Sequence, residues 1–167
     1  MLVAYFSLAG EQYNVGVVEE GNTSIIAHMI AEQTGAGLFE IKPETPYPTT
    51  YQGLLDVIRQ EMDNNARPEI ADTVDDMDAY DTIFIGYPIW WHTAPMIIGT
   101  FLESYDLSGK EIYPFSQSAS MDTEQFANSM DFVRTSAKNA AVHDELFAEA
   151  SDTDGILAYL TENGFAE

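Results

Sequence analysis

Short hydrophobic runs alternate along the chain with segments whose apolar positions recur every three or four residues. The runs are rich in β-branched and aromatic residues and predict strands at 2–6, 38–41, 82–86, 111–115 and, more weakly, 141–147. The segments between them predict helices over about 22–34, 49–63 and 123–138, with a further helix beginning at Pro95 and a last one opening at Ser151-Asp152-Thr153-Asp154, which resembles a capping box.

This repeated alternation of strand and helix predicts an α/β fold. It is typical of a doubly wound parallel sheet that is covered by helices on both faces. No repeat or linker divides the sequence, so we expect one domain over 1–167. Ligands of such sheets bind outside the carboxyl ends of the strands. The loops after the first, third and fourth strands are therefore the places to look for chemistry.

Composition narrows the classes of function. Six basic residues against 28 acidic ones give a net charge of −22, which argues against nucleic acid and anionic membranes as partners. Cysteine is absent, which excludes disulfides and thiol chemistry, so any redox work would need a bound cofactor. Three scattered histidines give no zinc signature. His28 and His143 are expected to be structural or exposed. The start of the chain lacks a basic leader, and we expect a cytoplasmic protein.

The first loop carries Ser7, Leu8 and Ala9, followed later by Gly21-Asn22-Thr23-Ser24 at the start of a helix. Hydroxyl groups and free backbone N–H groups at the positive end of a helix suit a phosphate. Ordinary N-capping by Asn22 or Thr23 is the alternative. Neither a G-x-x-x-x-G-K-[ST] loop nor a G-x-G-x-x-G fingerprint is present, so the motifs for ATP-driven and dinucleotide-binding proteins are missing.

The second loop holds both tryptophans of the chain, in Gly86-Tyr87-Pro88-Ile89-Trp90-Trp91-His92. Two adjacent tryptophans on a loop form a stacking wall that suits a flat heteroaromatic ligand. The alternative is a hydrophobic plug or a patch that contacts another protein. The third loop, Ser116-Gln117-Ser118-Ala119-Ser120, offers hydroxyl and amide groups to the polar edge of a ring, which alone is a weak signal.

Taken together, these motifs resemble the flavodoxin-like FMN-binding proteins of the short-chain type. The resemblance rests on Tyr5-Phe6-Ser7 with Gly21-Asn22-Thr23, on 42–48 (KPETPYP), on 65–68 (NARP) and above all on 87–91 (YPIWW). It implies a three-layer sandwich with an open five-stranded sheet in the order 2-1-3-4-5 and FMN as the cofactor. It also implies a phosphate held by Ser7, Asn22, Thr23 and Ser24. The full set of cofactor-binding residues expected from it is Ser7, Leu8, Ala9, Asn22, Thr23, Ser24, Pro88, Ile89, Trp90, Trp91, His92, Ser116, Gln117 and Ser118. No catalytic residue and no metal are expected.

Two departures from the family pattern stand out. Residues 11–20 are inserted into the phosphate loop and bring two acids, Glu19 and Glu20, close to the phosphate. His92 stands where many relatives have glycine. Because an imidazole titrates near pH 6.5, we hypothesise that His92 makes the FMN midpoint potential depend on pH around 6–7. An unchanged potential-versus-pH curve in His92→Gly would contradict this, and solvent exposure of His92 is the alternative.

The function implied is electron transfer between a reductase and an acceptor, with redox proteins as the partners. The acidic surface would steer basic partners, although solubility or halophilic adaptation also explains it. An NAD(P)H-dependent FMN quinone reductase on the same fold is the alternative, and the scarcity of basic residues for the phosphates of a nicotinamide cofactor disfavours it. A module of this fold that has lost FMN is a third hypothesis, which the double tryptophan disfavours.

Overall fold

The computed structural model describes residues 1–8, 10–12, 16–18, 20–90, 93–117 and 123–166. The strands are β1 (Leu2–Tyr5), β2 (Gly10–Gln12), β3 (Gly16–Val18), β4 (Gly37–Glu40), β5 (Thr82–Pro88), β6 (Glu111–Gln117), β7 (Ala141–Val142) and β8 (Leu146–Phe147). The helices are α1 (Asn22–Thr34), α2 (Tyr51–Asp63), the short 3-10 helix η1 (Met77–Ala79), α3 (Met96–Glu103), α4 (Thr123–Ser136) and α5 (Thr153–Glu162).

The main sheet is parallel and runs β4-β1-β5-β6, with β7 and β8 both paired to β6. The predicted order 2-1-3-4-5 and the α/β class are therefore confirmed. The fifth predicted strand is present as two short pieces, because the pairing stops at Val142 and resumes at Leu146. A second, antiparallel pair is formed by β2 and β3 within the inserted part of the first loop, and the sequence pattern did not indicate it.

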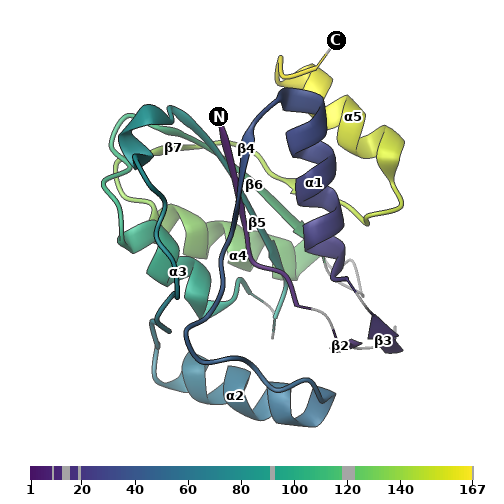
Figure 1. Ribbon diagram of the computed structural model, residues 1–167, viewed down its shortest axis with the longest axis vertical. Coiled ribbons are helices and arrows are strands. Elements are labelled where there is room, and N and C mark those ends of the chain that lie inside the picture. The colour runs from purple at the N-terminus through teal and green to yellow at the C-terminus, as the bar shows by residue number, and fades with distance from the viewer. Residues whose placement is uncertain (9, 13–15, 19, 91–92, 118–122, 167) are drawn as a thin grey trace.

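Alternating side chains along the central strands build two cores. On β1, Leu2, Ala4 and Phe6 belong to one buried cluster, which also contains residues of α2, α3 and α4. Val3 and Tyr5 belong to the other, which contains residues of α1 and α5. Figure 1 shows α1 and α5 on one side of the sheet and α3 and α4 on the other, while α2 lies past the carboxyl ends of the strands. The sheet edge that the sequence predicts as the site therefore faces α2.

The helices follow the predicted apolar stripes with small shifts at their ends. The apolar positions Ile97, Ile98, Phe101 and Leu102 of α3 are all buried, whereas on α2 only Leu54 and Ile58 are buried. The prediction that Pro95 is the first helical residue is wrong by one position: it is the N-cap of α3, with extended ψ, and the helix starts at Met96. The last helix has a side-chain cap, but one residue later than a capping box beginning at Ser151 would place it: the N-cap is Asp152, whose side chain accepts the Gly155 N–H.

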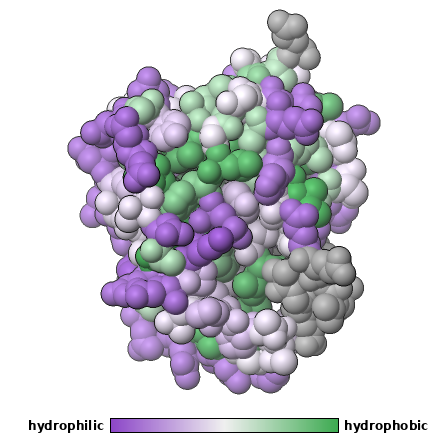
Figure 2. Space-filling view, viewed as in Figure 1, coloured by the Kyte–Doolittle hydropathy of each residue, from purple (hydrophilic) through white to green (hydrophobic). Residues whose placement is uncertain are grey.

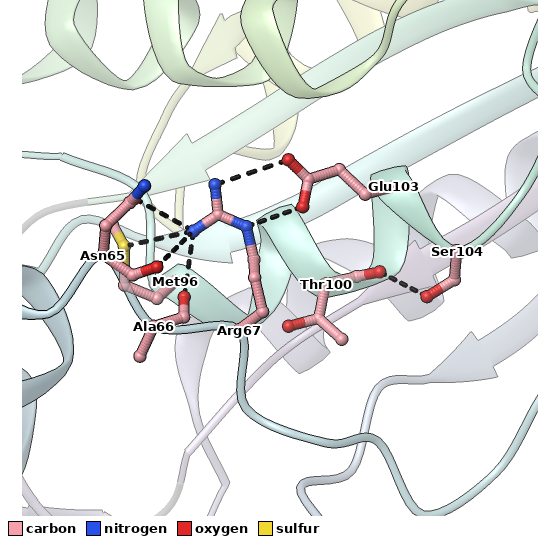
Figure 3. A network of polar contacts seen from close by, with 7 residues as sticks. All are labelled: Asn65, Ala66, Arg67, Met96, Thr100, Glu103 and Ser104. Atoms are coloured by element: carbon pink, nitrogen blue, oxygen red, sulfur yellow. Dashed lines mark hydrogen bonds and ion pairs between the residues drawn. The ribbon is translucent and has the colours of Figure 1, made fainter.

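The connection after α2 is fastened to α3 by Arg67. Its guanidinium donates to both carboxylate oxygens of Glu103, with Nε 2.6 Å from Oε2, and also to the backbone carbonyls of Asn65 and Ala66 (Figure 3). A bidentate pair of this kind fixes orientation as well as distance. Because α3 follows the tryptophan loop directly, this network sets the position of the loop's far end.

The surface is mostly hydrophilic, as the charge predicts. In the view of Figure 2, hydrophobic residues are visible in the upper middle of the face, around the edge strand β4 of Figure 1. Leu38 of β4 is one of two large hydrophobic side chains that are exposed in the described part of the chain. Among the described helices, none combines the length and apolarity that a bilayer span requires.

Candidate functional site

The predicted site residues that the structure describes lie at the carboxyl edge of β1, β5 and β6. They are Ser7, Leu8, Asn22, Thr23, Ser24, Pro88, Ile89, Trp90, Ser116 and Gln117. Ala9, Trp91, His92 and Ser118 lie outside the described residues, as does the hypothesis on His92. Parallel strands end at one edge, which is why loops far apart in sequence converge there.

The end of β1 meets the start of α1 at very close range. A Cβ built on Gly21 would lie 2.2 Å from Ser7 Oγ and 2.8 Å from the Leu8 carbonyl oxygen, so only glycine fits without a shift. The Ser7 oxygen is shielded from solvent and has no hydrogen-bond partner among the described residues. A buried hydroxyl without a partner is costly, and such groups are usually completed by water or a ligand.

The amino end of α1 has no side-chain cap. Its N-cap is Gly21, which has no side-chain oxygen, and the first turn contains no acidic residue. The alternative of N-capping by Asn22 or Thr23 is therefore wrong, since both residues lie inside the helix. Thr23 is buried, and Asn22 and Ser24 are half-buried. Uncapped N–H groups and the helix dipole make this end attractive for a phosphate.

An acid lies directly beside this helix end. The Ser24 hydroxyl donates to Oε1 of the exposed Glu20 at 2.7 Å, which places the carboxylate over the first turn of α1. One turn further on, His28 Nδ1 donates to the Ser24 carbonyl at 2.8 Å, and His28 is exposed as predicted. The sequence suggested an acid near the phosphate, but not this hydrogen bond.

The second loop is tied to the neighbouring strand and folded back on itself. The Ile89 N–H donates to the Gln117 carbonyl at 2.8 Å, which continues the β5–β6 ladder beyond Pro88. Trp90 and Thr93 exchange two backbone hydrogen bonds, of 2.8 and 3.1 Å. Backbone bonds therefore hold Ile89, Trp90 and Thr93 in place.

Trp90 packs inward rather than standing free. Its ring makes edge-on contacts with Phe6, at 5.0 Å between centroids, and with Tyr47, at 5.2 Å. Phe6 and Tyr47 also touch each other, at 5.7 Å. The plug interpretation of the loop therefore describes Trp90 well, because this half-buried ring covers the end of the core. Edge-to-face geometry is the favoured arrangement of such rings.

The support of Trp90 was missed by the sequence analysis. Tyr47 lies in the loop after β4, which was not among the loops chosen, and its hydroxyl donates to the Glu61 carboxylate of α2 at 2.9 Å. Burial raises the pKa of Glu61, and the Tyr47 hydrogen bond opposes that shift. The signal available was Tyr47 between Pro46 and Pro48, because two prolines fix the backbone that presents the ring.

The third loop contributes the end of β6. Ser116 is buried, and its hydroxyl oxygen also has no hydrogen-bond partner within the described part of the chain. Its carbonyl accepts the Ala148 N–H at 3.2 Å, while Gln117 is half-buried and accepts from Ile89. Among the described residues, the edge therefore carries two buried hydroxyl oxygens without a partner, that of Ser7 just after β1 and that of Ser116 on β6.

A separate cavity of about 270 Å³ lies against α4, at the break between β7 and β8. Its lining residues are Ala127, Met130, Asp131, Arg134, Asp144 and Glu145. Both Glu145 carboxylate oxygens are buried with no hydrogen-bond partner among the described residues. Burial raises the pKa of Glu145 to about 8, with the charge of Arg134 opposing the shift.

The structure also describes the surroundings of His143 and the grouping of possible metal ligands. His143 contacts Glu111 and stacks on Tyr113 at 4.2 Å, at the opposite end of β6 from Gln117. This is the structural role that the sequence suggested. Within the described ranges, no three acidic, histidine or cysteine residues are grouped as metal ligands.

Comparison with known proteins places this geometry in a family. The profile of the family described as Flavodoxin matches residues 1–162. No curated protein matches the chain significantly. Among solved structures, a protein from Bacteroides eggerthii that is provisionally described as a flavoprotein is 30% identical, with a TM-score of 0.79 over 96% of this chain and 95% of that one.

Two further solved structures are similar over nearly the whole chain. One, from Bacteroides uniformis and provisionally described as a flavoprotein, is 28% identical, with a TM-score of 0.80 over 96% of each chain. A flavoprotein from Lactobacillus acidophilus, described in complex with FMN, is 24% identical, with a TM-score of 0.70 over 92% of this chain and 95% of that one; this likeness concerns the fold. The match over 1–162 and the 30% identity show the family that the loop motifs indicated: the chain belongs to the flavodoxin family.

Proposed function

We propose that this flavodoxin-family chain binds FMN at the carboxyl edge of β1, β5 and β6 and carries electrons between a reductase and an acceptor protein. The observation that carries the proposal is the Ser7 hydroxyl, buried without a described partner against Gly21 at the uncapped start of α1. Family membership and the FMN complex of the Lactobacillus acidophilus flavoprotein support FMN as the cofactor.

The residues present fit FMN at both ends of the edge. Ser7, Asn22, Thr23 and Ser24 would hold the phosphate, since they combine hydroxyl donors with the first N–H groups of α1. Leu8, Pro88, Ile89, Trp90, Ser116 and Gln117 would contact the rest of the cofactor. When bound, FMN supplies one- and two-electron redox chemistry that no side chain of this cysteine-free protein offers.

The chain's own residues would position the cofactor and shield the end of the sheet from water. The two backbone bonds between Trp90 and Thr93 and the bond from Ile89 to Gln117 hold the second loop in place before any ligand arrives. Trp90 and Tyr47 cover the core beneath it and keep water from the end of the sheet. Preorganised loops of this kind lower the entropic cost of binding.

The charges favour a carrier over a reductase that binds a nicotinamide cofactor itself. Arg67 is engaged by Glu103, and the buried Lys110 donates to the carbonyls of Met77 and Tyr80. The loops after β1, β5 and β6 contain no basic residue to pair with the phosphates of NAD(P)H, and Lys42, just after β4, is paired with Glu40 at 3.5 Å. A net charge of −22 instead suits brief encounters with basic partners, which weaken as salt is added.

The test begins with a visible spectrum of the purified protein and an FMN titration of the apoprotein. We expect a yellow protein that anaerobic NADPH does not bleach until a reductase is added. Prompt bleaching by NADPH alone would support the quinone reductase instead. A colourless protein that does not take up FMN would overturn FMN binding and leave a module without cofactor.

A matched pair of variants tests the residue that carries the proposal. Ser7→Ala removes a donor that the phosphate would use, so we expect FMN affinity to fall about tenfold, or about 1.4 kcal/mol. Ser151→Ala removes an exposed hydroxyl before α5 and should leave the affinity unchanged. Equal affinities in the two variants would remove Ser7 from the site.

A further inference from the structure

The start of α1 already has an anion beside it. Glu20 immediately precedes the N-cap Gly21, and its carboxylate accepts the Ser24 hydroxyl proton across the first turn at 2.7 Å. Carboxylates near a helix N-terminus are stabilised by the helix dipole. Glu20 is exposed, and no basic side chain is paired with it among the described residues.

A second observation places the same acid in the electrostatic surroundings of the site. Tyr5 is the last residue of β1, two residues before Ser7. Its pKa is raised by burial first, then by Glu40 and also by Glu20, while a hydrogen bond with Ser24 lowers it. The His28 ring lies 5.9 Å from the Tyr5 ring and its Nδ1 is 3.5 Å from Ser24 Oγ. Glu20, Ser24 and Tyr5 therefore form one interacting group at the phosphate end of the site.

We infer that Glu20 is a built-in competitor of the FMN phosphate, an acid that occupies the anion position of the apoprotein and lowers affinity for the phosphate group specifically. The inference rests on the proposed function and adds a specificity-determining residue to that site. It assigns to Glu20 no contact with the flavin ring.

Glu20 and the phosphate would compete for two reasons: Ser24 has only one hydroxyl proton to donate, and both groups are negatively charged. A serine hydroxyl has one proton, so Ser24 donates either to Glu20 or to a phosphate oxygen, not to both. A phosphate that takes up Ser24 brings two negative charges to the place where the carboxylate lies. The repulsion falls with distance and salt, but a separation of a few ångströms is well inside the Debye length of about 8 Å at physiological salt.

Removing the charge should therefore have opposite effects on the two states of the protein. Glu20→Gln keeps the side-chain length and an oxygen that accepts from Ser24, but removes the negative charge. We expect FMN to bind about tenfold more tightly, because one like charge beside the phosphate is gone. We expect the apoprotein to melt about 1–2 °C lower, because the helix end loses its anion.

The experiment compares three apoproteins by isothermal titration with FMN and with riboflavin, together with their melting temperatures. They are the unmodified protein, Glu20→Gln, and the control Glu32→Gln, which removes the same charge from an exposed position near the far end of the same helix. Riboflavin lacks the phosphate, so its affinity should agree within about twofold among the three. High salt should shrink the FMN difference between Glu20→Gln and the control.

The outcomes separate this inference from the proposed function. If the unmodified protein binds neither FMN nor riboflavin, the proposed function fails and the inference falls with it. If FMN binds but Glu20→Gln matches Glu32→Gln, binds FMN less tightly, or gains as much affinity for riboflavin, FMN binding stands and the competition is overturned. Tighter binding of FMN alone, with a less stable apoprotein, supports it.

Discussion

The aromatic end of the site, around Trp90, and the phosphate end, around Ser7, differ in how many of their groups have partners within the chain. Around Trp90, the described groups have partners within the chain: ring contacts with Phe6 and Tyr47, the Tyr47–Glu61 hydrogen bond and the backbone bonds between Trp90 and Thr93. At Ser7 and the start of α1, the buried hydroxyl has no described partner and the helix has no side-chain cap. The aromatic end belongs to the folded core, whereas the phosphate end is left for a ligand to complete.

This difference predicts where substitutions act. A change at the aromatic end should alter the free energy of unfolding first and cofactor affinity as a consequence. A change at the phosphate end should alter affinity first and leave unfolding nearly unaffected. Three substitutions test the contrast.

Phe6→Ala should have the largest effect, on stability. Phe6 is fully buried beneath Trp90 and Tyr47, so the variant leaves a cavity and should lose about 3–5 kcal/mol of unfolding free energy in urea denaturation. Phe6→Leu keeps most of the volume and should lose less. A loss below about 1 kcal/mol in Phe6→Ala would show that the aromatic end is not part of the core.

Gly21→Ala, at the phosphate end, should act mainly on FMN affinity rather than on stability. The added Cβ would meet the Leu8 carbonyl and Ser7 Oγ, which forces the first loop away from α1. We expect FMN affinity to fall about 30- to 100-fold, or about 2–2.7 kcal/mol, measured by fluorescence titration. The control is Gly37→Ala on β4, where an added Cβ meets only ordinary contacts, the nearest at 3.6 Å. Equal affinities in both variants would contradict the close approach.

Glu145→Gln extends the comparison to a buried carboxylate that lies outside the site. Because the pKa of Glu145 is raised to about 8, the folded state holds the proton more tightly than the unfolded chain. This group's contribution to stability is therefore full below about pH 4.5 and is lost as the pH rises through about 8.

Glu145→Gln should remove this loss of stability at high pH. Discounted for the remaining solvent exposure of the side chain, it should be about 1–2 kcal/mol more stable than the unmodified protein above pH 8, with FMN affinity unchanged. Melting temperatures between pH 5 and 9 provide the measurement. Parallel curves for the two proteins would mean that Glu145 ionises in the fold as freely as in solution.

The fold was predictable because its signals are local. The buried runs of β1, β5 and β6 are nearly continuous in apolar residues, as strands covered on both faces are, and the helices between them carry clear stripes. The break in the fifth strand falls on the polar triplet His143-Asp144-Glu145, which weakened the predicted strand without showing that it would pair with β6 on both sides of the break. The β2–β3 pair lies in short segments with little alternation.

The site was predictable only where a motif lies within one loop. Adjacent residues identify each of three motifs: Ser7 after the first strand, Gly21-Asn22-Thr23, and the tryptophan loop. The contact of Tyr47 with Trp90 joins two loops more than 40 residues apart, and the Tyr47–Glu61 bond joins a loop to a helix. Such pairs depend on how the elements pack, and no local pattern records them.

The bond from the Ile89 N–H to the Gln117 carbonyl has a consequence for the order in which the site is assembled. The first 90 residues contain the phosphate loop and Trp90, yet the acceptor that anchors the second loop, the Gln117 carbonyl, is made only when β6 is complete. During translation, a nascent chain that ends before β6 would present half of a site. The protein would therefore become competent for its ligand late in synthesis, and a chain divided between α3 and β6 would regain competence only when the two pieces meet.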